Sequence, residues 1–165
     1  MDCLEADYRP SPRIDVRVIR IRTRETIADS RIKALILRAV EASHYLGTTP
    51  QAFYDEIADN IAGDMLGVFV GFTKWQEHSA PYPIALTIVF LPMSETQMGP
   101  QVPIAYSESR ELSLLIGKRV RVWLTENGYD KLYCLNLLHD DDAYCRVFRH
   151  VGEPRVVGSV VEVML

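Results

Sequence analysis

The segment from Ser107 to Tyr129, SESRELSLLIGKRVRVWLTENGY, constrains the fold of this chain more than any other. Its apolar residues recur three or four positions apart, which is the pattern of a helix with one buried face. Ser107 or Ser109 is the expected N-cap, and Gly128 is the expected C-terminal capping glycine. Strand-like runs flank it, VPIAY before and KLYCLNLL after, so the helix is expected to cover a sheet. Its buried face comprises Leu112, Leu115, Ile116, Val120, Trp123 and Leu124.

Alternating and apolar runs predict the remaining elements. The run VRVIRIRTRE indicates a half-buried strand with Arg20, Arg22 and Arg24 on one face, interpreted as solvated edge-strand charge, with an anion site as the alternative. Helices are expected within residues 28–47 and 48–63. The predicted element order is βααβββαβαβ. The predicted strands are Val16–Thr23, Leu66–Phe72, Ile84–Leu91, Val102–Tyr106, Lys131–Leu137 and Arg155–Val163.

The composition is typical of one globular domain, with 165 residues of which 48% are hydrophobic and 24% charged. A net charge of −4 gives no indication of nucleic-acid binding. No apolar run approaches the ~20 residues of a membrane span. The three cysteines lack metal-ligand spacing and fit a reducing cytoplasm. Residues 1–15 are expected to form an irregular arm before a single domain at 16–165.

The segment HDDDAYCRVFRHVG, from His139 to Gly152, has two interpretations. One is a carboxylate and histidine metal site, but consecutive residues do not readily converge on one ion. The other is the start of a helix, where aspartates accept backbone N–H bonds and favour the positive helix end. We therefore interpret Asp140–Asp142 as a helix start and predict no metal site. Cys145 is interpreted as a buried apolar thiol rather than a nucleophile.

The order and spacing of these elements resemble the GCN5-related N-acetyltransferase (GNAT) family over roughly residues 16–165. IRIRTRETIADSRIKAL is similar to the opening strand and first helix of the family. RVRVWLTENGYDKLYCLNLL is similar to its third helix and fifth strand, and DDDAYCRVFRHVG to its fourth helix, which ends in a glycine. The resemblance implies an α/β (α+β) fold, with a mixed, mostly antiparallel central sheet flanked by helices.

The resemblance also implies acetyl-CoA as the cofactor and the turn Tyr106–Ser113 as its binding site. In the family a glycine-rich turn holds the pyrophosphate through backbone N–H groups at a helix N-terminus. Here the turn reads YSESRELS, without glycine, and Glu108 and Glu111 each cost about 1 kcal/mol or more of anion affinity. If the cofactor binds, the expected contacts are Tyr106, Ser107, Ser109 and Arg110.

The family's catalytic acid is a tyrosine on the fourth helix, which protonates the departing CoA thiolate. Aligning Gly152 with the family's glycine places Phe148 at that tyrosine, and a phenyl ring has no hydroxyl to donate. Tyr144 lies one turn earlier on the same helix face and is the candidate acid of this chain. Phe148 is instead predicted to fill the space beside the diverging strands.

In lacking both the glycines and the tyrosine, the chain resembles degenerate GNAT-like proteins, bacteriophage virion proteins among them. This resemblance implies a non-catalytic structural or protein-interaction component. A protein partner or self-association is then expected, and no membrane partner. The alternative is an acetyl-CoA-dependent N-acetyltransferase, in which an amine attacks the thioester directly. The expected location is the cytoplasm, or a virion if the protein is viral.

Overall fold

The computed structural model describes residues 15–43, 47–74, 80–135, 145–146, 148–149, 151–157 and 160–165. Seven strands of this part of the chain form one sheet, in the order β1-β2-β3-β4-β5-β7-β6. Neighbouring strands are antiparallel, except β4 and β5, which run parallel. The predicted class, a mixed and mostly antiparallel sheet flanked by helices, is therefore confirmed.

The helices and strands begin and end close to the positions that the sequence predicts. Thr49 and Ser109 cap α3 and α4, and Gly128 follows α4 with a φ of +84°, as expected for a C-terminal capping glycine. None of the described helices is long and apolar enough to cross a membrane. The elements are β1 Asp15–Ile21, α1 Arg24–Ile27, α2 Ser30–Ala42, α3 Pro50–Asn60, β2 Leu66–Lys74, β3 Tyr82–Phe90, β4 Gln101–Ser107, α4 Arg110–Glu126, β5 Lys131–Leu135, β6 Glu153–Val157 and β7 Val160–Met164.

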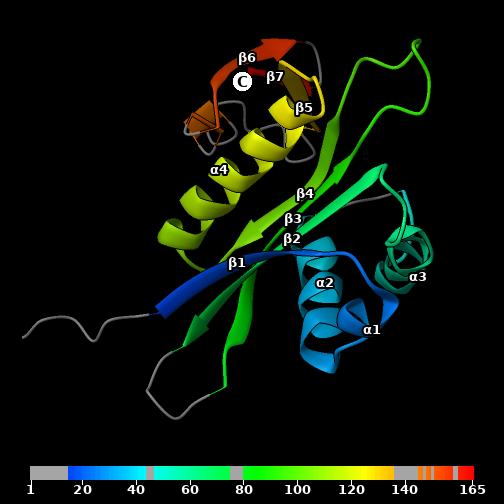
Figure 1. The fold of residues 1–165 in the computed structure, drawn as a ribbon, viewed down its shortest axis with the longest axis vertical. Helices are drawn as coiled ribbons and strands as arrows, with labels where there is room; N and C mark the ends of the chain where they lie inside the picture. The colour runs from blue at the N-terminus through cyan, green and yellow to red at the C-terminus, as the bar shows by residue number, and fades with distance from the viewer. Residues whose placement is uncertain are drawn as a thin grey trace, which may run out of the picture.

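The sheet separates two apolar layers (Figure 1). On one face α1, α2 and α3 bury a cluster that includes Leu35, Phe53 and Ile57. On the other face α4 buries a second cluster that includes Val120 and Leu124. The edge strand β1 lies between α4 on one side and α2 on the other (Figure 1). The helices thus cover both faces of the sheet.

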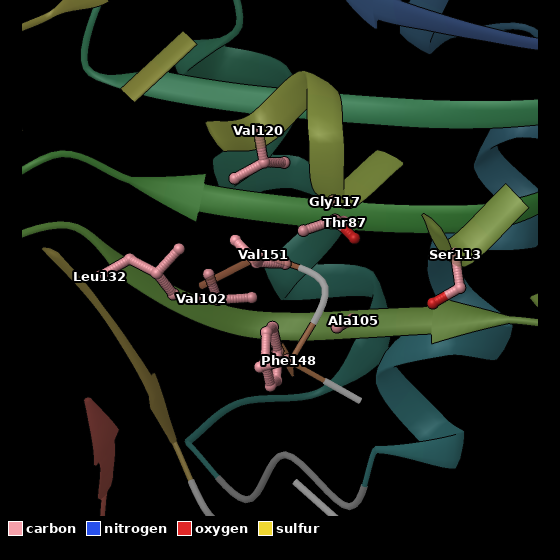
Figure 2. A pocket seen from close by; sticks show the side chains of 9 residues that line it. All are labelled: Thr87, Val102, Ala105, Ser113, Gly117, Val120, Leu132, Phe148 and Val151. Carbon is pink, nitrogen blue, oxygen red and sulfur yellow. The ribbon is translucent and has the colours of Figure 1, made fainter. Parts of the chain in front are cut away.

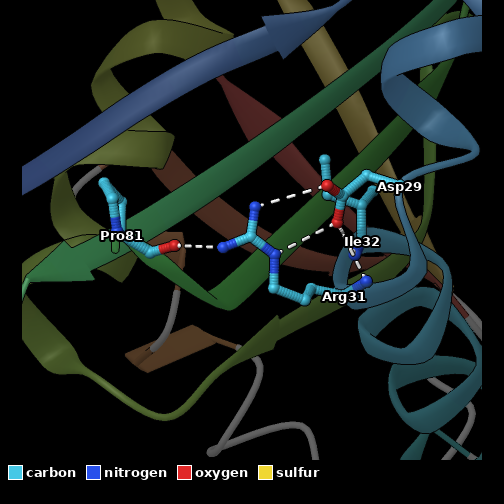
Figure 3. A network of polar contacts seen from close by, with 4 residues as sticks. All are labelled: Asp29, Arg31, Ile32 and Pro81. Atoms are coloured by element: carbon cyan, nitrogen blue, oxygen red, sulfur yellow. Dashed lines mark hydrogen bonds and ion pairs between the residues drawn. The ribbon is translucent and has the colours of Figure 1, made fainter. Parts of the chain in front are cut away.

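A polar network fixes the start of α2 against the chain that enters β3 (Figure 3). The Asp29 side chain accepts hydrogen bonds from the backbone N–H groups of Arg31 and Ile32, at 2.9 and 3.4 Å. The Arg31 guanidinium donates to both oxygens of Asp29 and, at 2.9 Å, to the carbonyl of Pro81. The N-cap of α2 is therefore also a tertiary contact between two segments far apart in the sequence.

The first strand is shorter than predicted. The strand expected at Val16–Thr23 ends at Ile21, because Thr23 is the N-cap of the short helix α1. Its side-chain oxygen accepts from the N–H of Thr26 at 3.2 Å, a local hydrogen bond that competes with the strand ladder. Arg24, expected on the strand's arginine face, belongs to α1 instead.

The last predicted strand, Arg155–Val163, is two strands rather than one. β6 and β7 pair antiparallel, and β7 also pairs with β5, so β6 becomes an edge of the sheet. The sequence carried a signal for this hairpin that the prediction missed. Residues 158–159 are Gly-Ser between two valine-rich runs, which is a turn signal when it separates two strand-like segments.

A buried carboxylate joins three strands at this end of the sheet. Glu162 of β7 is only 5% exposed. It accepts a hydrogen bond from the Tyr133 hydroxyl at 2.8 Å and pairs with the Arg155 guanidinium, while the Lys131 ammonium lies 3.9 Å away. The Tyr133 hydrogen bond, and then Arg155, hold the pKa of Glu162 below its ordinary value of 4.5, although burial opposes them. The charged form of Glu162 therefore stabilises the folded protein.

We expect this carboxylate to make the stability depend on pH in the acidic range. Because its folded pKa is lowered, its contribution is present above the ordinary glutamate pKa of 4.5 and is lost as the pH falls through the folded pKa. Glu162→Gln should lower the thermal midpoint at neutral pH and flatten its fall with acid. Glu153→Gln, an exposed neighbour on β6, is the control and should retain the pH dependence of the parent.

Candidate functional site

The strands β4 and β5 separate part-way along the sheet. Among the residues that the structure describes, they pair in parallel at Gln101 with Tyr133 and at Val102 with Cys134. Beyond these pairs β4 runs on to Ser107, bonded to β3 on one side but to none of the described residues of β5 on the other. Within the described ranges the sheet is thus open beside the second half of β4.

Phe148 and Val151 lie in this opening. Phe148 is 6% exposed and Val151 is also buried, and both pack in the apolar cluster beneath α4. A cavity of about 30 Å³ lies between them, β4 and α4. Figure 2 shows the ring of Phe148 beside β4, and the remaining cavity is lined by Thr87, Val102, Ala105, Ser113, Gly117, Val120, Leu132, Phe148 and Val151.

The turn between β4 and α4 forms hydrogen bonds with its own serines. The Ser107 hydroxyl donates to the carbonyl of Ser109 at 2.6 Å and accepts from the N–H of Ser109 at 3.1 Å. The Ser109 hydroxyl caps α4 by accepting from the N–H of Leu112 at 3.3 Å. The N–H of Glu108 bonds to the Ile84 carbonyl of β3 at 3.0 Å. Three N–H groups that could face an anion are therefore already bonded within the protein.

Glu108 has a cationic partner that the sequence did not indicate. The Arg38 guanidinium of α2 donates to its carboxylate at 2.9 Å, and the Tyr106 hydroxyl donates to the same oxygen at 2.8 Å. The Tyr106 hydroxyl, and then the charge of Glu108, raise the pKa of Arg38, although burial acts against them. Because Arg38 offsets its charge, Glu108 repels an anion at the turn less than its sequence position implied.

The structure distributes the predicted site residues over two faces of the sheet. Ser107 and Ser109 lie in the turn, and Arg110 is exposed in the first turn of α4. Tyr106 packs against the apolar cluster on the α2 face, opposite the layer that contains Phe148. The cofactor role of these residues stays a prediction. Tyr144, the candidate acid, lies outside the described residues.

The other reactive candidates contribute little to the site. His139 and Asp140–Asp142 lie outside the described residues, and the described part of the chain contains no cluster of side chains able to hold a metal ion. Burial raises the pKa of the Cys134 thiol well above its ordinary value. Cys145 is half-buried against the cluster beneath α4. Both thiols lie in apolar surroundings, although Cys145, which was predicted to be buried, is only half-buried.

Comparison with known proteins identifies the fold. No model of a known protein family matches the sequence, and no curated protein matches it. Solved structures match in three dimensions. A GNAT-family acetyltransferase from Streptococcus pneumoniae aligns over 92% of this chain and 99% of its own, with 8% identity and a TM-score of 0.60.

Two further solved structures have the same arrangement. Spermidine N-acetyltransferase from Vibrio cholerae, in complex with CoA and spermine, aligns over 92% of this chain and 95% of its own, with 11% identity and a TM-score of 0.52. An aminoglycoside acetyltransferase from an uncultured soil metagenomic sample aligns over 86% of this chain and 92% of its own, with 15% identity and a TM-score of 0.55. At such identities the similarity concerns the fold alone, so this chain is a protein with the GNAT fold.

Proposed function

We propose that this GNAT-fold protein is a non-catalytic structural or protein-interaction component. The observation that carries the proposal is the filled opening between β4 and β5. Phe148 and Val151 leave about 30 Å³ there, whereas a site for a small molecule normally has several hundred cubic ångströms. An acyl-CoA arm entering this opening would have to displace Phe148 from the apolar cluster.

The turn before α4 supports the same proposal. A pyrophosphate binds at a helix N-terminus when free N–H groups point at it. Here the hydroxyls of Ser107 and Ser109 occupy the N–H groups of Ser109 and Leu112, and the Ile84 carbonyl occupies that of Glu108. A diphosphate bound through these three N–H groups would have to replace hydrogen bonds that the folded protein already makes, so its net gain in free energy from them is small.

The position of the expected acid points in the same direction. Phe148 stands where the resemblance places the proton donor, and its ring is buried among apolar side chains without a hydroxyl. A group that protonates a thiolate must carry a titratable proton within hydrogen-bonding reach. In this proposal Phe148 is a core residue. The location proposed for the protein is the cytoplasm, or a virion if the protein is viral.

The alternative is an acetyl-CoA-dependent N-acetyltransferase, and one observation favours it. The parallel strands still diverge, and the N-terminus of a 17-residue helix still lies at the end of β4. The dipole of that helix attracts an anion whether or not glycine is present. Under this alternative Tyr144 is the acid, and Phe148 moves aside when the cofactor enters.

A calorimetric titration with acetyl-CoA separates the two functions. We expect no saturable heat of binding to the parent protein. Micromolar binding together with acetyl transfer to any of a panel of amines, polyamines and aminoglycosides included, would overturn the proposal. Phe148→Tyr serves as a second arm, because it restores a hydroxyl at the position of the family's acid. Under the proposal this variant also transfers no acetyl group.

A further inference from the structure

The edge strand β1 and helix α4 enclose a groove on the sheet edge opposite to β6. β1 is the terminal strand of the sheet and, among the described strands, pairs only with β2. The backbone N–H and C=O groups along its other edge are therefore available to a further strand. Proteins normally protect such an edge because it is a template for pairing with another chain.

The groove is hollow and has an apolar floor. One hollow of about 670 Å³ runs along the free edge of β1, and a second of about 170 Å³ continues it toward the end of α4. Val18, Arg119 and Val122 line both hollows, so the two form one groove. Val122 is 51% exposed and contributes an apolar side chain to the lining of both hollows.

The rim of the groove is strongly cationic in a protein whose net charge is −4. Its charged residues are Arg17, Arg20, Arg22, Lys118 and Arg119, with Glu126 as the acid among its lining residues. No ion pair joins Arg17, Arg22, Lys118 or Arg119 to another residue in the described ranges.

Arg20, one of the cations that line the groove, is partly buried against Trp123 and close to Arg22. Its guanidinium lies 4.6 Å from the centre of the Trp123 ring and donates to the carbonyl of Leu66 at 3.2 Å. Burial, and then the charge of Arg22, lower its pKa. Arg20 is therefore half-buried, not solvated as the strand pattern suggested, and the groove keeps an excess of positive charge that a negatively charged ligand would offset.

We propose that the groove between β1 and α4 binds an extended acidic peptide segment of a partner protein, which adds to the free edge of β1 as a strand. Backbone pairing supplies affinity and alternate side chains supply specificity in this mode of recognition. One set of peptide side chains covers Val18 and Val122, and carboxylates on the rim meet Arg17, Lys118 and Arg119.

Two other occupants fit the groove less well. A second copy of this chain, paired through β1, would bring two arginine-rich strands together, and facing like charges are destabilising. A single-stranded nucleic acid needs exposed rings on which its bases stack. The rings that line the groove, Phe69 and Trp123, are both buried, and Arg20 covers the face of Trp123.

The test uses the full chain and a fluorescein-labelled peptide of alternating valine and glutamate, about as long as β1. We expect saturable binding by fluorescence anisotropy that weakens as salt rises. Lys118→Glu with Arg119→Glu should weaken it on the order of tenfold or more. Arg121→Glu, an exposed position on the same helix outside the groove lining, is the control and should change it little. A peptide with proline at alternate valines keeps its charge but cannot pair, and should not bind.

Several outcomes would overturn this inference. Equal binding of the proline peptide would show attraction by charge without strand addition, and binding only of a labelled oligouridine would show a nucleic-acid site. Binding that appears only after Asp2, Glu5 and Asp7 are changed to their amides would show that the chain's own N-terminal segment occupies the groove. Self-association abolished by Lys118→Glu with Arg119→Glu would show a second copy there.

This inference deepens the proposed interaction role and rests on it, but the two fail separately. Peptide binding is measured at the edge strand β1, whereas acetyl-CoA binding is measured at the opening between β4 and β5. Binding of acetyl-CoA would overturn the proposed function and leave the peptide result standing. Absence of peptide binding would contradict the peptide site proposed in the groove and would not affect the proposed function, which rests on the opening beside β4.

Discussion

Replacing Phe148 with alanine is expected to lower the free energy of unfolding by about 3–5 kcal/mol, the range for truncating a buried aromatic side chain. The ring is 6% exposed and packs in the apolar cluster beneath α4. Among the described residues, no strand pairs with the second half of β4 on this side, so none is placed to refill the space. The loss is measured by chemical denaturation, with Met93→Ala, an exposed apolar truncation, as the control.

The same variant tests the proposed function. If Phe148 fills the position of an absent cofactor arm, its removal enlarges the cavity beside β4, and an apolar probe molecule should bind there and recover part of the lost stability. An alanine variant as stable as the parent would contradict the core role of the ring. Acetyl-CoA binding by the parent, with Phe148→Ala of unchanged affinity, would show that the ring does not close the site.

Gly152→Ala is expected to cost about 3 kcal/mol, at the upper end of the range for overpacking. A Cβ atom built at this glycine overlaps with the backbone carbonyl of Met164 on β7. That carbonyl cannot move easily, because Met164 is paired with Lys131 of β5 on one side and with Glu153 of β6 on the other. We expect a lower unfolding midpoint and faster hydrogen exchange in β7.

The matched control is Gly63→Ala. Gly63 has no positive φ, and the nearest atom to its Cβ position is the Asn60 carbonyl oxygen at 3.3 Å. Its substitution should change the stability by about 0.5 kcal/mol or less, as at most surface positions. Equal effects of the two substitutions would mean that chain entropy, and not the contact with β7, explains the requirement for glycine at 152.

The structure gives a different reason for glycine at position 152 than the sequence suggested. The resemblance marked it as the glycine that ends a helix, and helix ends often need a left-handed residue. Among the described glycines, positive φ occurs at Gly99 and Gly128 and not at Gly152. The requirement at Gly152 is space, set by a strand that follows it and folds back over it. No local pattern encodes that distance.

The sequence by itself determined the elements whose signals are local. Helix α4 follows from the spacing of its apolar residues, its beginning from the Ser109 cap and its end from Gly128. The apolar runs of β2 and β3 were likewise sufficient. These features depend on hydrogen bonds and burial patterns within a few residues, so the chain carries them wherever it folds.

Only the tertiary structure decided which distant groups meet. Arg38 pairs with Glu108, Arg20 packs on Trp123, and Phe148 occupies the opening beside β4. Each contact joins segments far apart in the sequence, and a periodic pattern states which face of an element is buried but not against what. The groove of β1 and α4 arises in the same way, because its cations come from two separate elements that the order of strands brings together.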